Sequence, residues 1–96
     1  MQRDQVIDIL TKHRAQLRSF GVQSLALFGS VARDEARADS DVDILVDLEP
    51  PLTFDRYMNV KLYLEDHLGT KVDVVMSKSL HPQIRLAVEQ EMIYVA

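Results

Sequence analysis

Helix-like and strand-like segments alternate along this sequence, and the alternation leaves few architectures open to it. Apolar residues spaced three, four and seven positions apart predict helices, whereas short apolar runs bounded by glycine, proline or polar residues predict strands. The predicted helices cover residues 3–18, 53–68 and roughly 82–90, and the predicted strands cover 24–29, 42–48, 71–76 and 92–95. Strands that alternate with helices are typical of an α/β layer architecture.

Local signals mark where several of these segments end. Thr53 is a predicted N-cap, and Gly69 is the expected stop of the same helix. The apolar side of that helix is expected to comprise Phe54, Tyr57, Met58, Leu62, Leu64 and Leu68. The connection between the first two strands is short for a right-handed parallel crossover. We therefore expect a small mixed β-sheet flanked by helices, in a single domain spanning residues 1–96.

Composition excludes several classes of protein. The 96-residue chain has no cysteine, which rules out disulfides and thiolate zinc sites. Its formal charge is −4 with scattered Lys and Arg, so we expect no direct DNA binding. No apolar run reaches the ~20 residues needed to cross a membrane. The N-terminal stretch MQRDQVIDIL carries acids and is not a signal peptide, so a cytoplasmic location is expected.

Aspartates occur on two segments that are otherwise apolar. Asp41 and Asp43 have the same parity along the 42–48 strand, and Asp73 lies within the later strand KVDVVM. If these two strands are neighbours, all three carboxylates can share one face and provide oxygen ligands for Mg²⁺. Solvated strand positions are the commoner explanation of an Asp-x-Asp pair, so both interpretations stay open on this pattern alone.

Gly29-Ser30 is a second candidate binding feature. Glycine lets a backbone approach a ligand closely, and a serine beside it offers a hydroxyl and amides to phosphate oxygens. We expect a helical turn or two over 31–37, with Ser30 near its N-cap. The usual glycine-rich phosphate-loop motifs are absent from the sequence, and an isolated Gly-Ser pair is most often only a turn.

The combination is more specific than its parts. Gly29-Ser30 is followed by ten residues and then by Asp41-Val42-Asp43, within LFGSVARDEARADSDVDILV. This pattern resembles the DNA-polymerase-β-like nucleotidyltransferase superfamily, and most closely the minimal nucleotidyltransferases, which are single-domain proteins. The strand KVDVV and the closing segment IRLAVEQEMIYV fit as well. The resemblance implies a polymerase-β-like nucleotidyltransferase core.

Many minimal nucleotidyltransferases are antitoxins paired with HEPN-domain toxins, which are ribonucleases. The resemblance implies an enzyme that transfers AMP from ATP to a tyrosine of such a toxin, in a hetero-oligomer with it. Gly29 and Ser30 would hold the triphosphate, Asp41 and Asp43 would bind two Mg²⁺ ions, and Asp73 would bind one ion and act near the attacking hydroxyl. The ions would also let an acidic protein bind ATP.

Two other functions are compatible with the sequence. The protein could neutralise a toxin by binding and occluding it without catalysis, or it could transfer a nucleotide to a small molecule or RNA. The remaining polar residues are expected to have no part in the chemistry. Arg33 could touch phosphate and Arg85 could reach the nucleotide or the toxin, but a surface position is the commoner explanation of both. Asp47 lies at the far end of its strand, and the histidines 13, 67 and 81 share no ligand spacing and are predicted as surface residues.

Overall fold

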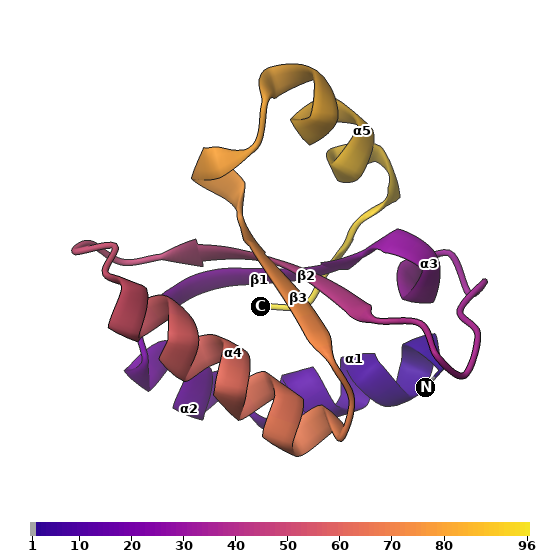
Figure 1. The fold of residues 1–96 in the computed structure, drawn as a ribbon, viewed down its shortest axis with the longest axis horizontal. Helices are drawn as coiled ribbons and strands as arrows, with labels where there is room; N and C mark the ends of the chain where they lie inside the picture. The colour runs from indigo at the N-terminus through magenta and orange to yellow at the C-terminus, as the bar shows by residue number, and fades with distance from the viewer. Residues whose placement is uncertain (1) are drawn as a thin grey trace.

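A computed structural model of the chain describes residues 2–96, which form a four-stranded sheet with helices on both faces (Figure 1). The helices are α1 (Arg3–Lys12), α2 (Arg14–Ser19), α3 (Gly29–Ala32), α4 (Phe54–Leu68) and α5 (Pro82–Glu91), with a 3₁₀ turn η1 (Ser77–Ser79). The strands are β1 (Val22–Phe28), β2 (Val42–Leu48), β3 (Val72–Met76) and β4 (Ile93–Tyr94).

The sheet is mixed, as the short connection between the first two strands indicated. Its order is β3-β2-β1-β4. β1 is antiparallel to both β2 and β4, whereas β2 and β3 are parallel and are joined through α4. The parallel pair needs this helical crossover because both strands must start at the same edge of the sheet.

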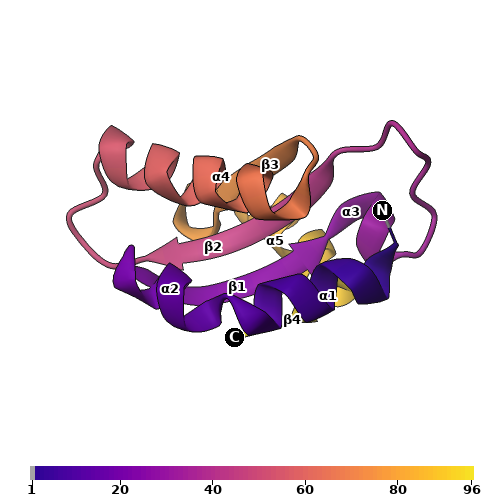
Figure 2. The same cartoon turned by 90° about the horizontal axis from the view of Figure 1, so that it is seen from below.

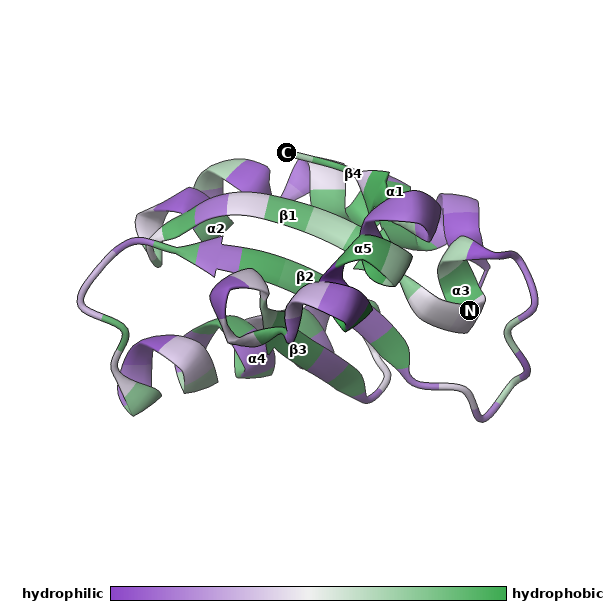
Figure 3. Cartoon of the chain, turned by 90° about the horizontal axis from the view of Figure 1, so that it is seen from above, coloured by the Kyte–Doolittle hydropathy of each residue, from purple (hydrophilic) through white to green (hydrophobic). Residues whose placement is uncertain are grey.

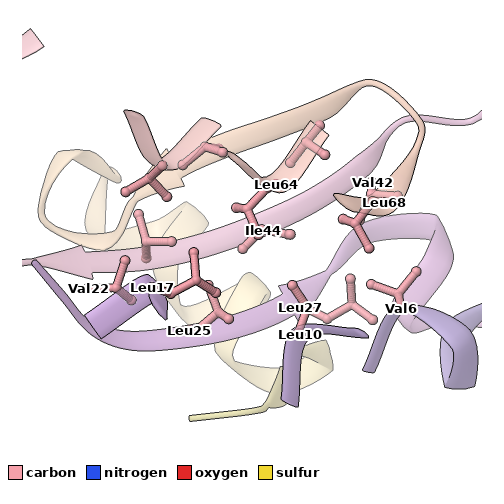
Figure 4. Packing of buried hydrophobic residues seen from close by; sticks show 14 of the residues in the cluster. Val6, Leu10, Leu17, Val22, Leu25, Leu27, Val42, Ile44, Leu64 and Leu68 are labelled. Atoms are coloured by element: carbon pink, nitrogen blue, oxygen red, sulfur yellow. The ribbon is translucent and has the colours of Figure 1, made fainter. Parts of the chain in front are cut away.

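Helices α1, α2 and α4 cover one face of the sheet, and α5 lies over the other (Figures 1 and 2). Alternation along β2 sends Val42, Ile44 and Val46 to the first face, where each is almost completely buried. They pack there with side chains from the helices, including Leu10 and Leu64 (Figure 4). This layer is the main hydrophobic core, and its burial is the main stabilising term for a chain of this size.

The face covered by α5, called here the α5 face, is less apolar. A small cluster of Ala26, Leu45 and Val88 anchors α5 to the middle of the sheet. Polar residues interrupt the apolar sequence of β2, as the hydrophilic colour along this strand shows (Figure 3). Alternation therefore gives β2 one fully apolar face and one face that also carries acids.

The predicted helix over 3–18 is broken in two at His13. The Nδ1 atom of His13 lies 2.7 Å from the hydroxyl oxygen of Tyr63 on α4, and its ring lies 4.3 Å from that of His67. His13 is half-buried, so the expectation that it is a surface residue was wrong, whereas His67 is exposed as expected. The side-chain contact with α4 holds the chain at this residue, and the helix resumes at Arg14.

Both end signals of α4 are confirmed. The Thr53 side chain accepts a hydrogen bond from the Arg56 N–H (3.1 Å), and Gly69 adopts φ +68° at the C-terminal end. The expected apolar side was partly wrong, because Phe54 and Leu62 are 74% and 55% exposed. The predicted Leu64 and Leu68 do lie in the main core, together with Val60, which was not predicted. Within residues 2–96, neither α4 nor another helix is long and apolar enough to cross a membrane.

Candidate functional site

The aspartates of β2 and β3 lie side by side. Asp43 and Asp73 are directly paired in the parallel ladder, and strands in a sheet are about 4.8 Å apart. Their neighbours Val42 and Val72 point into the main core, so both aspartates point to the α5 face. Asp41 is exposed and directly precedes β2, close enough for its charge to act on Asp43. The structure therefore places Asp43 and Asp73 on one face, with Asp41 beside them at the entry to β2.

The Gly29-Ser30 turn borders the same group. β1 ends at Phe28, which pairs with Asp43 across the antiparallel ladder. The next residue, Gly29, has φ +77°, and a Cβ atom placed on it would lie only 2.0 Å from Oδ2 of Asp43. The Asp43 carboxylate thus packs against the bare Cα of Gly29. A side chain at this position would collide with the acid, and positive φ also favours glycine here.

The short helix after this turn differs from the expectation. We predicted helical turns over 31–37 with Ser30 near the N-cap, but α3 covers only Gly29–Ala32 and its N-cap is Phe28. Ser30 is therefore half-buried in the first turn of α3. The helix begins earlier because the positive φ of Gly29 turns the chain directly out of the strand, and Ser30 follows it in the first turn of α3.

Asp43 has the most perturbed environment of the three acids. Its half-burial raises the pKa of its carboxyl above the usual value, and the negative charges of Asp73 and Asp41 raise it further. Arg33 acts in the opposite direction, while Glu91 adds to the increase. Ionised Asp43 therefore lies in a crowded, partly desolvated and negatively charged surrounding. A positive charge placed here would relieve this repulsion.

The three carboxylates fit a hard divalent cation by the chemistry of their donor atoms and by their closeness to one another. Magnesium prefers oxygen ligands and commonly shares its coordination sphere with substrate phosphates. Within residues 2–96, no three acidic or histidine side chains surround a common point closely enough to hold an ion. Joint ligation by Asp41, Asp43 and Asp73 therefore requires side-chain rotation, since bare carboxylates repel one another.

Glu91 joins this region although the sequence gave no sign of it. One of its carboxylate oxygens accepts a hydrogen bond from the Gly29 N–H (3.2 Å), and the other lies 2.9 Å from Nη1 of Arg33. Arg33 is exposed, as expected, but it is held by this ion pair. Glu91 is 62 residues from Gly29 in the chain. Nothing in its local sequence distinguishes it from the neighbouring Glu89, so only the fold reveals the contact.

Asp47 lies on the same face but at the other end of β2, as expected. Its carboxylate accepts hydrogen bonds from the Ser24 hydroxyl (2.9 Å) and from the buried Ser77 hydroxyl. These bonds, that from Ser77 above all, hold the pKa of Asp47 below its usual value. Asp47 thus ties β1, β2 and η1 together, and through η1 it fixes the start of the segment that leads to α5.

We expect the replacement Asp47→Asn to lower the free energy of unfolding at pH 7 by about 1–2 kcal/mol, because it weakens two hydrogen bonds to a charged acceptor. A lowered folded-state pKa means that this stability is present above the unfolded-state pKa of about 3.9 and is lost as the pH falls through the folded-state pKa. Urea unfolding at pH 7 and at pH 3 measures the difference, which should shrink in acid. Asp8→Asn, which breaks an exposed ion pair with Lys12, should change little at either pH. Equal effects of the two variants would contradict the prediction.

Comparisons with known proteins point in one direction. Residues 9–95 match the nucleotidyltransferase domain family. The chain is 44% identical over 93 residues to protein adenylyltransferase MntA of Thermococcus cleftensis. The alignment covers 96% of this chain and 94% of that protein. A solved structure described as a candidate minimal nucleotidyltransferase is 36% identical, with a TM-score of 0.86 over 97% of this chain and 95% of its own. The chain also resembles, in fold alone, a chain of the solved complex of a tri-AMPylated Shewanella oneidensis HEPN toxin with an MNT antitoxin. The identity is 20% and the TM-score is 0.68, over 94% of this chain and 71% of the other.

Proposed function

Because the chain belongs to the nucleotidyltransferase domain family, we propose that it is an antitoxin that transfers AMP from ATP to a tyrosine of a HEPN-domain toxin and so inactivates that toxin. The fold agrees with the polymerase-β-like core that the sequence indicated. The observation that carries the proposal is the placement of Asp43 and Asp73 on one face beside the Gly29 turn, with Asp41 next to them. The name of the Thermococcus cleftensis relative supports protein as the acceptor class.

In this proposal the Gly29-Ser30 turn holds the triphosphate of ATP. Gly29 brings the backbone close to the ligand because it has no side chain, and Ser30 offers its hydroxyl and its amide to phosphate oxygens. A solved structure of similar fold, at 21% identity, is described as a toxin–antitoxin with AMP-PNP, an ATP analogue. This supports ATP as the nucleotide, and we propose that the reaction takes place in the cytoplasm.

Asp41 and Asp43 would each contact both of two magnesium ions, and Asp73 would contact one of them. When bound, two such ions supply charge that stabilises the attacking and the leaving oxygens of an in-line displacement. The raised pKa of Asp43 in the metal-free protein is consistent with a carboxylate placed to receive positive charge. Half-burial of Asp43 against Gly29 would hold its carboxylate close to a triphosphate bound at the turn.

The transfer forms a bond between the tyrosine oxygen and the α-phosphorus of ATP and breaks the bond from that phosphorus to the β-phosphate oxygen. Pyrophosphate leaves with the electron pair. A tyrosine hydroxyl, with a pKa of about 10, is a poor nucleophile at neutral pH. Asp73 is exposed at the start of β3, so its carboxylate is accessible to an incoming protein side chain and would accept the phenolic proton.

The test uses a HEPN-domain protein as the acceptor, together with α-labelled ATP and magnesium. We expect label on a tyrosine of that protein, and we expect its ribonuclease activity to fall as label accumulates. Asp41→Asn and Asp43→Asn should each abolish labelling. Asp39→Asn is the matched control, because it removes an acid from the exposed loop just before the site and should label normally.

The alternatives give different results in the same assay. If the Asp41→Asn and Asp43→Asn variants still neutralise the toxin as well as the natural protein does, the antitoxin acts by occlusion rather than by modification. Label found on RNA or on a small metabolite, and not on protein, would assign the enzyme to another acceptor class. Size-exclusion chromatography of the mixture tests the expected hetero-oligomer directly.

A further inference from the structure

We propose that Glu91 is a positioning residue for AMP transfer: it fixes the Gly29-Ser30 turn to the end of α5 and thereby holds the triphosphate site in place. This inference rests on the proposed function for its kinetic consequence, but the contact itself is observed. Glu91 is the last residue of α5, and both of its carboxylate oxygens are engaged by the segment that starts at Gly29.

The buried side chains of Val31 and Ala32 hold α3 on the main-core side, and Glu91 provides the polar contact to its backbone on the α5 side. Among residues 2–96, Glu91 is the only side chain from another element that hydrogen-bonds to the backbone of α3. The other backbone contacts of α3, such as the Glu35 N–H to the Ser30 carbonyl oxygen (2.9 Å), come from the chain that directly follows. The connection from α3 to β2 has no regular structure. Glu91 therefore supplies the link between this turn and the body of the sheet on its α5 side.

Small displacements of the turn should affect catalysis because Gly29 lies very close to the Asp43 carboxylate. The Asp43 carboxylate already packs against the Cα of Gly29, so a shift of the turn moves the phosphate-binding amides relative to a proposed metal ligand. Groups in an active site must be held to within about 0.5 Å, and an error of about 1 Å can slow a reaction roughly 100-fold. A link through Glu91 restrains this motion.

The identity of the side chain also has a reason. A glutamate here adds negative charge to a region that already contains Asp43, and its charge helps to raise the pKa of that acid. An uncharged glutamine could accept from the Gly29 N–H without that repulsion. The carboxylate is explained by the second contact, because it forms a charge-assisted bond to Arg33 at 2.9 Å. Glu91 thus restrains α3 at both of its ends.

Two variants of Glu91 and one matched control test the proposal. Glu91→Ala removes both contacts, whereas Glu91→Gln keeps an acceptor for the Gly29 N–H and removes the ion pair with Arg33. The control is Glu89→Ala, which removes the same charge from the same helix and breaks an exposed ion pair with Arg85 (3.0 Å). Amide hydrogen exchange of Gly29 is measured first, without nucleotide, and then the Kd of magnesium–AMP-PNP and the kcat and KM for ATP.

We expect Glu91→Ala to speed exchange of the Gly29 amide by roughly tenfold or more. We also expect it to raise the Kd of AMP-PNP and the KM for ATP by roughly 10- to 100-fold, because loss of an orienting partner commonly has an effect of this size. Because the turn binds the triphosphate in the ground state and in the transition state alike, KM should change more than kcat. Glu91→Gln should retain most of the amide protection and show a smaller increase in KM. Glu89→Ala should behave as the natural protein.

Unchanged exchange of the Gly29 amide in Glu91→Ala would overturn the proposal, as would normal Kd and KM values at a temperature where the variant is folded. Tighter AMP-PNP binding by Glu91→Ala would also overturn it, because Glu91 would then be an anion that competes with the triphosphate. Failure of the proposed function looks different: the natural protein itself would not bind AMP-PNP or transfer AMP, whereas the exchange result would still report on the Glu91 contact.

Discussion

Asp43→Asn is expected to abolish AMP transfer and, at the same time, to raise the stability of the magnesium-free protein. Divalent cations stabilise transition-state charge by several kcal/mol. Loss of a ligand proposed to contact both ions should therefore slow transfer by about 10³-fold or more. The gain in stability follows from the surroundings of the acid, which is half-buried and faces the negative charges of Asp73 and Asp41. Removing its charge removes both penalties.

The pH dependence gives the sign of this effect. Because the folded-state pKa of Asp43 is raised, its protonated form contributes favourably to the free energy of folding. This contribution is complete below the unfolded-state pKa of about 3.9 and is lost as the pH rises through the folded-state pKa. At pH 7 the natural protein has lost this contribution, so Asp43→Asn should be more stable there and should have the higher Tm. Below about pH 4 the two proteins should converge.

Thermal unfolding with and without magnesium measures both parts of the prediction. Magnesium should raise the Tm of the natural protein, since a ligand that binds only the folded state stabilises it, and should raise that of Asp43→Asn much less. Asp39→Asn, in the exposed loop, is the control for a change in net charge. A Tm for Asp43→Asn equal to or below that of Asp39→Asn at pH 7 would contradict the argument.

Gly29→Ala is expected to reduce both activity and stability. The added Cβ would lie 2.0 Å from Oδ2 of Asp43, so the carboxylate has to leave its position against the turn. We expect at least a roughly 100-fold loss of AMP transfer, the size typical of a displacement of about 1 Å in an active site. An L-residue in the left-handed region costs about 1–2 kcal/mol, which adds a fall in Tm of roughly 4–16 °C.

Gly69→Ala separates the two causes. Gly69 has φ +68°, close to the +77° of Gly29, but a Cβ atom there meets nothing within 4 Å. The control should therefore show the loss of stability without the loss of activity. Activity of Gly29→Ala equal to that of Gly69→Ala, at a temperature where both are folded, would show that the contact with Asp43 has no catalytic importance.

Much of the fold was predictable because its signals are local. Each strand was expected close to its observed position, and 42–48 was expected at its observed bounds. Thr53 and Gly69 marked the two ends of α4 correctly, since capping depends on a residue and its immediate neighbours. The signals failed where packing decides. The exposed Phe54 and Leu62 fit a helical apolar pattern, but the surface of the sheet lies under the side of α4 that carries Val60.

The sequence by itself determined the types of the elements, the common parity of Asp41 and Asp43, and the spacing of these acids from Gly29-Ser30. All of these follow from side-chain alternation and from turn chemistry within one segment of chain. Only the tertiary structure decided that Asp73 pairs with Asp43, that the Asp43 carboxylate packs against the Cα of Gly29, and that Glu91 reaches the same turn. Strand register and the packing of α5 bring together residues that are far apart in the chain. No local pattern encodes those distances, because they depend on how the whole core closes around the sheet.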